Sequence, residues 1–118
     1  MNNKKRIGNI GEELASKYLE KNGYTIDTMN FYSKYGEIDI VAKFEETIIF
    51  VEVKTRTNLL CGHPIESISY RKKNHLKNTA RYYLFINKTY NLDIRFDAIE
   101  VYLKDHKYKI NHIKDIID

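Results

Sequence analysis

Residues 36–56, GEIDIVAKFEETIIFVEVKTR, contain two apolar segments on either side of the short polar stretch FEET. Apolar runs of this length around a short polar break predict an antiparallel β-hairpin. If Glu45 and Glu46 form a two-residue turn, the register of the hairpin places Asp39 directly opposite Glu52. The hairpin therefore brings two acidic residues together in strands where a packed sheet usually has Val or Ile.

Strand alternation adds a lysine to this pair of acids. In the predicted register, one face of the hairpin carries Glu37, Asp39 and Val41 together with Ile48, Phe50, Glu52 and Lys54. Two carboxylates about 5 Å apart repel each other by about 3 kcal/mol at an effective dielectric constant of about 20. A proton held by one carboxyl, the Lys54 ammonium, or a divalent cation between the carboxylates could relieve this repulsion. Of these three, a bound divalent cation makes use of every group present. The alternative is that the residues have no function and form an acid–lysine cluster on an exposed sheet face.

Two further segments have the apolar spacing of helices. Residues 7–22 place apolar side chains on one helical face, and Gly23 follows as a stop signal. A second helix is expected over about residues 67–86, with Ser67 or Ser69 as its N-cap.

Additional strands are expected at residues 24–32, 93–103 and 107–113. Because a helix separates strand 47–54 from strand 93–103, these two strands form a plausible crossover unit and are expected to run parallel. The expected fold class is therefore α/β with a mixed sheet.

Length and composition limit the class of protein. The chain has 118 residues, of which 42% are hydrophobic and 31% charged, so we expect a single globular domain over residues 1–118. Cys61 is the only cysteine, which excludes an internal disulfide, and Cys61 with His63 gives too few ligands for zinc. No signal peptide pattern and no run near the ~18 apolar residues of a membrane span is present, so we expect a cytoplasmic protein.

Positive charge is concentrated at the start of the second predicted helix. Within residues 71–81, RKKNHLKNTAR, the candidate phosphate-binding side chains are Arg71, Lys72, Lys73 and Lys77, and Arg56 joins them from the hairpin. Cations at a helix N-terminus oppose the helix dipole, and a bound phosphate would remove that conflict. The alternative is a solvated helix face. Tyr70, Tyr82 and Tyr83 could stack on bases, although aromatic residues at this spacing more often fill a core.

Four motifs in order, GNIGEELA, YGEIDIVA, FVEVKTR and RFD, resemble the YraN-like family of small bacterial proteins over about residues 8–103. Asp39 followed after twelve residues by EVK is similar to the core of the PD-(D/E)xK nuclease superfamily, and the family is similar to archaeal Holliday-junction resolvases. The resemblance implies a restriction-endonuclease-like mixed sheet flanked by two main helices. Ile38 stands where the superfamily has proline, and Cys61 stands where an aromatic residue is more usual.

The resemblance also implies roles for individual residues. It implies that Asp39, Glu52 and the Val53 carbonyl bind Mg²⁺ or Mn²⁺, and that Glu12 completes the acidic cluster. Lys54 would polarise or deprotonate the attacking water, and the sequence leaves both roles open because desolvation favours a neutral lysine whereas nearby acids oppose it.

Helical phase distinguishes Glu12 from its neighbour Glu13. Glu13 lies in a polar stripe with Lys17, which indicates a surface position. Glu12 lies at the edge of the apolar stripe, from which its carboxylate could reach Asp39 and Glu52, and Gly11 allows a close backbone approach.

Together these patterns predict an Mg²⁺-dependent endonuclease acting on DNA, with branched or otherwise structured DNA as the expected substrate. The main alternative is a nucleic-acid-binding or scaffold module that keeps the fold without catalysis, and an RNA nuclease would use the same site. No membrane partner is expected, and two-fold cutting of a junction would require a homodimer. Asp97 in RFD is expected to be structural, paired with Arg95 or Arg56.

Overall fold

The computed structural model describes residues 3–57 and 69–117 of the chain. Its elements are α1 (Asn3–Lys21), β1 (Thr25–Ser33), β2 (Gly36–Phe44), β3 (Thr47–Arg56), α2 (Tyr70–Ile86), β4 (Asp93–Lys104) and β5 (Lys107–Ile113). Each predicted helix and strand is present, although α1 begins earlier than its apolar spacing indicated. Cys61, His63 and Ser67 lie outside the described residues.

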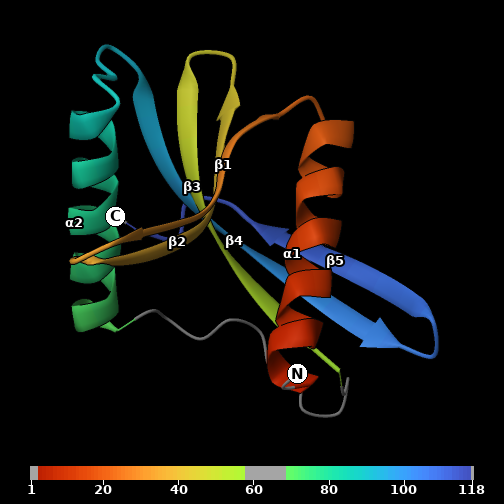
Figure 1. The fold of residues 1–118 in the computed structure, drawn as a ribbon. Coiled ribbons are helices and arrows are strands. Elements are labelled where there is room, and N and C mark those ends of the chain that lie inside the picture. The colour runs from red at the N-terminus through yellow and green to blue at the C-terminus, as the bar shows by residue number, and fades with distance from the viewer. Residues whose placement is uncertain (1–2, 58–68, 118) are drawn as a thin grey trace.

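The strands form one sheet in the order β1-β2-β3-β4-β5. Strands β3 and β4 are parallel, and the other neighbouring pairs are antiparallel. Helix α1 covers one face of the sheet and α2 covers the other (Figure 1). The predicted fold class, a mixed α/β sheet flanked by two helices, is confirmed. Among the described residues, neither helix is long and apolar enough to cross a membrane.

Each helix forms its own hydrophobic core with the sheet. On the α1 face, the fully buried side chains include Ala15, Leu19, Ile40, Ile49, Val51, Ile99 and Val101. On the α2 face, the buried side chains are Ile38, Val41, Ile48, Phe50, Leu76, Ala80, Tyr83 and Ile117. Burial of each large side chain contributes about 1.5–3 kcal/mol, so both helices are fixed by apolar packing.

The helix ends have the expected capping groups. Ser69 is the N-cap of α2, and its Oγ accepts a hydrogen bond from the backbone N–H of Lys72 at 3.2 Å. At the end of α1, Gly23 has φ 92°, and the N–H of Tyr24 donates to the carbonyl of Leu19 at 3.0 Å. This left-handed residue reverses the chain into β1.

The hairpin register follows the predicted turn, but the two strands separate before they reach the acids. Pairing between β2 and β3 runs from Phe44 and Thr47 to Ile40 and Val51, as the two-residue turn predicts, and ends there. Beyond this point β2 stays paired with β1 as far as Gly36, and β3 stays paired with β4 as far as Arg56. The sheet therefore forks between β2 and β3, and Figure 1 shows the two strand ends diverging.

Side-chain alternation in β2 breaks at the same place. Ile38 and Ile40 are two residues apart, but they pack in the α2 and α1 cores respectively. Asn30 of β1, between the partners of these two residues, has φ 53°. The prediction that strict alternation places Glu37, Asp39 and Val41 on one face is therefore wrong, because Ile38 and Val41 pack on the same face of the sheet although they are three residues apart.

Candidate active site in the fork of the sheet

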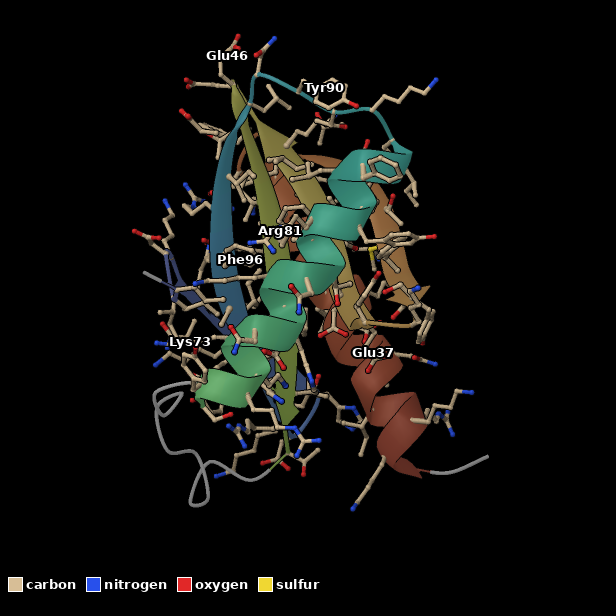
Figure 2. All side chains as sticks on the ribbon, turned by 90° about the vertical axis from the view of Figure 1, so that its left-hand side faces the viewer. Glu37, Glu46, Lys73, Arg81, Tyr90 and Phe96 are labelled. Atoms are coloured by element: carbon tan, nitrogen blue, oxygen red, sulfur yellow. The ribbon has the colours of Figure 1, made fainter. Side chains whose placement is uncertain are left out.

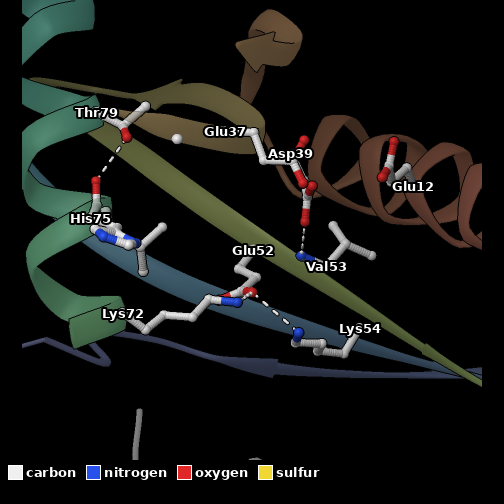
Figure 3. A pocket seen from close by; sticks show the side chains of 11 residues that line it. Glu12, Glu37, Asp39, Glu52, Val53, Lys54, Lys72, His75 and Thr79 are labelled. Carbon is white, nitrogen blue, oxygen red and sulfur yellow. Dashed lines mark hydrogen bonds and ion pairs between the residues drawn. The ribbon is translucent and has the colours of Figure 1, made fainter. Parts of the chain in front are cut away.

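The fork holds a pocket of about 420 Å³ between the sheet, α1 and α2. Among the residues that line it are Glu12 from α1, Glu37 and Asp39 from β2, Glu52, Val53 and Lys54 from β3, and Lys72, His75 and Thr79 from α2 (Figure 3). The four residues predicted to be catalytic, Glu12, Asp39, Glu52 and Lys54, therefore line one pocket.

Asp39 occupies the point where the strands separate. Its Oδ2 accepts a hydrogen bond from the backbone N–H of Val53 at 2.8 Å, so the side chain replaces a strand-to-strand backbone bond. The pKa of Asp39 is raised to about 6, because burial and the charges of Glu12 and Glu52 raise it more than the Val53 hydrogen bond lowers it. Asp39 is thus largely ionised at neutral pH, but at a cost that its surroundings do not fully offset.

Two lysines compensate the negative charge of Glu52. Its Oε1 lies 3.2 Å from Lys54 Nζ and also forms an ion pair with Lys72 Nζ, and its side chain is 13% exposed. Burial lowers the pKa of Lys72, but the hydrogen bond and charge of Glu52 outweigh burial and raise it overall. Three ways to relieve the repulsion between the acids were considered. At Glu52 the structure shows compensation by lysine ammonium groups.

Glu12 and Glu13 occupy the positions that helical phase predicted. Glu12 lines the pocket, where burial raises its pKa and a hydrogen bond with Asn30 opposes that effect. Glu13 points away and forms an exposed ion pair with Lys17 at 3.2 Å. The phase prediction is confirmed.

Gly11 explains how α1 comes close enough to contribute Glu12. A Cβ at this position would lie 2.9 Å from the Cβ of Thr55 and closer still to its Oγ1. The absence of a side chain therefore allows the α1 backbone to lie directly against β3.

The predicted phosphate-binding residues have different surroundings in the structure. Lys72 enters the pocket, whereas Lys73 and Glu37 lie on opposite sides of α2 (Figure 2). Arg56 lies 3.9 Å from the fully buried Glu100, and Lys77 lines a separate hollow beside Phe96. Arg71 is exposed at the start of α2. Whether these cations bind nucleic acid stays a prediction.

The three tyrosines considered for base stacking also differ. Tyr83 is buried in the α2 core, where its hydroxyl contacts Asp27 and forms a 2.8 Å hydrogen bond with Thr28. Tyr82 is half-buried and Tyr70 is 82% exposed. The core interpretation is therefore confirmed for Tyr83.

Sequence patterns missed two residues that line the pocket, His75 and Thr79, and one that contacts a lining residue, Asn30. Asn30 contacts Glu12 from β1, and His75 and Thr79 line the pocket from α2. The side chain of Thr79 donates to the carbonyl of His75 at 2.7 Å. Only the tolerance of Asn for left-handed backbone could have drawn attention to Asn30, and no local pattern identifies the other two.

The donor groups fit a hard cation held by few protein ligands. Among the described residues, no group of three or more His, Cys, Asp or Glu side chains is arranged to hold a metal. Mg²⁺, however, commonly takes only one or two protein carboxylates and keeps several waters. Asp39 and Glu52 supply that number of carboxylates, so the site suits Mg²⁺ or Mn²⁺ better than zinc.

Comparison with known proteins gives the family but no activity. The model of the uncharacterised protein family UPF0102 matches residues 11–101. A UPF0102 protein of Clostridioides difficile is 49% identical over 113 residues, which cover 96% of this chain and 96% of the relative. A UPF0102 protein of Caldicellulosiruptor saccharolyticus is 48% identical over 115 residues, which cover 96% of this chain and 98% of the relative.

A crystal structure of SSO0001 superposes with a TM-score of 0.39 at 17% identity, and the match covers 99% of this chain and 55% of that one. A structural similarity of that size carries no functional argument. The family match and these relatives confirm the resemblance to the YraN-like proteins: the chain belongs to the uncharacterised protein family UPF0102, the YraN family.

Proposed function

We propose that this protein is a metal-dependent nuclease that hydrolyses phosphodiester bonds in DNA, with branched or otherwise structured DNA as its substrate. The observation that carries the proposal is the convergence of Glu12, Asp39, Glu52 and Lys54 on one pocket. These residues come from α1, β2 and β3. A cluster of acids with raised pKa values beside lysines in a cleft is typical of a functional site.

Asp39 and Glu52 are the residues that would hold Mg²⁺ or Mn²⁺, together with the Val53 carbonyl that the family resemblance implies. When bound, the cation would supply Lewis acidity and neutralise negative charge that develops on the phosphoryl oxygens. Asp39 can act as an anionic ligand at neutral pH because its pKa of about 6 leaves it mostly ionised. Glu12 adds a negative charge at the edge of the same pocket.

Lys54 and Lys72 supply positive charge beside Glu52. A cation at Glu52 would compete with both ammonium groups, and a displaced lysine would be free to contact a phosphate oxygen. Lys54 would either stabilise charge on the phosphate or take a proton from the attacking water.

A nucleic-acid-binding or scaffold module is the second candidate, and a specific observation favours it. Glu52 already has two lysine partners, and Asp39 already accepts a hydrogen bond from Val53. A fold retained without catalysis would need only such internal compensation.

The test is a panel of labelled duplex, nicked, flapped and four-way DNA, with a matched RNA, incubated with Mg²⁺, Mn²⁺ or EDTA. A nuclease cuts at least one DNA only with metal, and Asp39→Asn abolishes the cuts without lowering the melting temperature. Binding without cuts at any metal concentration would leave the scaffold module as the function. Cuts in RNA alone would assign the site to RNA, and symmetric cuts in the four-way DNA would indicate a dimer.

A further inference from the structure

A second hollow, of about 500 Å³, lies beside the fork pocket. It is lined by Tyr35, Asn78, Arg81, Tyr82 and Phe85. Tyr35 and Asn78 are each followed in the chain by a residue that lines the fork pocket. The two hollows are therefore lined by neighbouring residues of the β1–β2 turn and of the middle of α2. We call this second hollow the Tyr35 hollow.

Aromatic rings form the wall of the Tyr35 hollow. The ring centroid of Tyr82 lies 5.6 Å from that of Tyr35 and 6.3 Å from that of Phe31. Phe31 in turn makes a 4.9 Å edge contact with the buried Tyr83. Tyr35 is 40% exposed and Phe85 is 71% exposed. Core contacts therefore hold one side of the aromatic cluster while its outer rings remain open.

The turn that carries Tyr35 is held in place. Ser33 Oγ accepts a hydrogen bond from the backbone N–H of Tyr35 at 3.1 Å and donates to the carbonyl of Gly36 at 3.3 Å. Gly36 has φ 141°, and a Cβ there would lie 3.1 Å from Thr79 Oγ1, so the turn packs closely on α2. A ring on a fixed turn loses little conformational freedom on binding a ligand.

The charge around the rings suits a nucleotide. Lys34 Nζ lies 5.2 Å from the centroid of Tyr35, and Arg81 contributes to the lining. Among the described residues, no Asp or Glu lines this hollow. Aromatic faces beside cations bind single-stranded nucleic acid, because bases stack on the rings while the cations attract the phosphates.

We infer that the Tyr35 hollow binds an unpaired nucleobase of the strand whose phosphate enters the fork pocket. The inference rests on the proposed function and narrows its substrate class. Bases in an intact duplex already stack on one another and would have to unstack before they could reach the rings. The favoured substrate is therefore DNA with a single-stranded flap or gap beside the phosphate at the fork pocket.

The experiment measures binding in EDTA, so that cleavage does not interfere. The probes are a flapped DNA with 2-aminopurine in the flap and a duplex of the same length, and the chain has no Trp to disturb the fluorescence. Tyr35→Ala and Phe85→Ala should each weaken flap binding on the order of tenfold and change duplex binding less than about twofold. Tyr35→Phe keeps the ring and should bind like wild type.

Two controls separate stacking from other effects. Phe85→Leu keeps apolar surface without a ring, so it should lose flap affinity as Phe85→Ala does. Tyr90→Ala removes another tyrosine, 69% exposed, that lies at the opposite end of α2 from Lys73 (Figure 2), and it should bind the flap normally.

Three outcomes would overturn the inference. If wild type binds flap and duplex equally and Tyr35→Ala changes neither, the hollow holds no base, although metal-dependent cleavage of duplex would still support the proposed nuclease. If the Phe85 variants abolish self-association in sedimentation while DNA binding is unchanged, the surface joins two copies of the chain. If wild type neither binds nor cuts any DNA, the inference and the proposed function fail together.

Discussion

Two acidic residues within the sheet, Asp97 on β4 and Asp39 on β2, have opposite electrostatic surroundings. Asp97 is fully buried, and each of its carboxylate oxygens lies 2.8 Å from a guanidinium nitrogen of Arg95. It also lies 2.7 Å from His112 Nε2 and accepts the backbone N–H of Asp115 at 3.0 Å. Burial would raise the pKa of Asp97, but hydrogen bonds from His112 and Arg95 outweigh it and lower the pKa.

Asp39 accepts a hydrogen bond from Val53, and three acidic neighbours raise its pKa together with burial. Asp97 therefore has cationic partners within the chain, whereas no lysine or arginine of the described residues forms an ion pair with Asp39. The difference indicates that Asp97 stabilises the fold through its pairing with Arg95. It also supports the proposal that Asp39 binds a cation from outside the chain.

Asp97→Asn should have the largest effect on folding. The change removes the charge that Arg95 and His112 contact, so the free energy of unfolding should fall by roughly 3–5 kcal/mol. Urea denaturation measures it, with the exposed Asp93→Asn on the same strand as a control that should change it by under about 0.5 kcal/mol. Equal stabilities of the two variants would show that the Asp97 contacts do not hold β4 to the C-terminal segment.

Asp39→Asn should have the reverse profile. We expect metal-dependent cleavage to fall by about 100-fold or more, while the melting temperature stays level or rises because an acid is removed from among other acids. DNA binding in EDTA should persist or tighten, since less negative charge faces the phosphate. Unchanged cleavage would remove Asp39 from the proposed metal site.

Glu12→Gln and Glu13→Gln test the edge of the pocket. Loss of the Glu12 charge should lower cleavage on the order of tenfold, as the loss of a residue that supports a metal ligand typically does. Glu13→Gln should retain wild-type cleavage because its partner is the exposed Lys17. Parallel rate measurements with melting temperatures decide between them, and a larger defect at Glu13 would contradict the proposed role of Glu12.

Lys72→Ala and Lys73→Ala compare a pocket lysine with its neighbour. Removal of the Lys72 ion pair with Glu52 should tighten Mn²⁺ binding about fivefold, measured by calorimetry, and weaken DNA binding in the presence of metal. The salt dependence of DNA binding should lose about one phosphate contact. Lys73→Ala should leave Mn²⁺ affinity unchanged. If both variants bind Mn²⁺ like wild type, Lys72 does not compete for Glu52.

The pH dependence of stability should carry opposite signs at the two acids. Asp39 has a pKa of about 6 in the fold against an ordinary value of 3.8, so its stabilising contribution is complete below 3.8 and is lost as pH rises through about 6. Asp97, with a lowered pKa, stabilises above its ordinary value and loses this contribution on acidification. Melting temperatures of wild type and Asp39→Asn should therefore diverge between about pH 4 and 6, and parallel curves would contradict the assigned burial of Asp39.

The sequence alone determined the features that depend on short-range periodicity. The turn at Glu45 and Glu46 set the hairpin register, and helical phase separated Glu12 from Glu13. The motifs of the hairpin also predicted which acids would line one pocket, because turn length acts over a few residues.

Only the tertiary structure decided which side chains become the partners of the acids. Side-chain alternation in β2 breaks between Ile38 and Ile40. The packing of α2 against the sheet also brings Lys72 into an ion pair with Glu52. Asp97 also forms a hydrogen bond with His112 on another strand, in addition to its bonds with Arg95, which the sequence suggested. These contacts join segments far apart in the chain, and their distances depend on how helices and strands pack, which no local pattern of residues encodes.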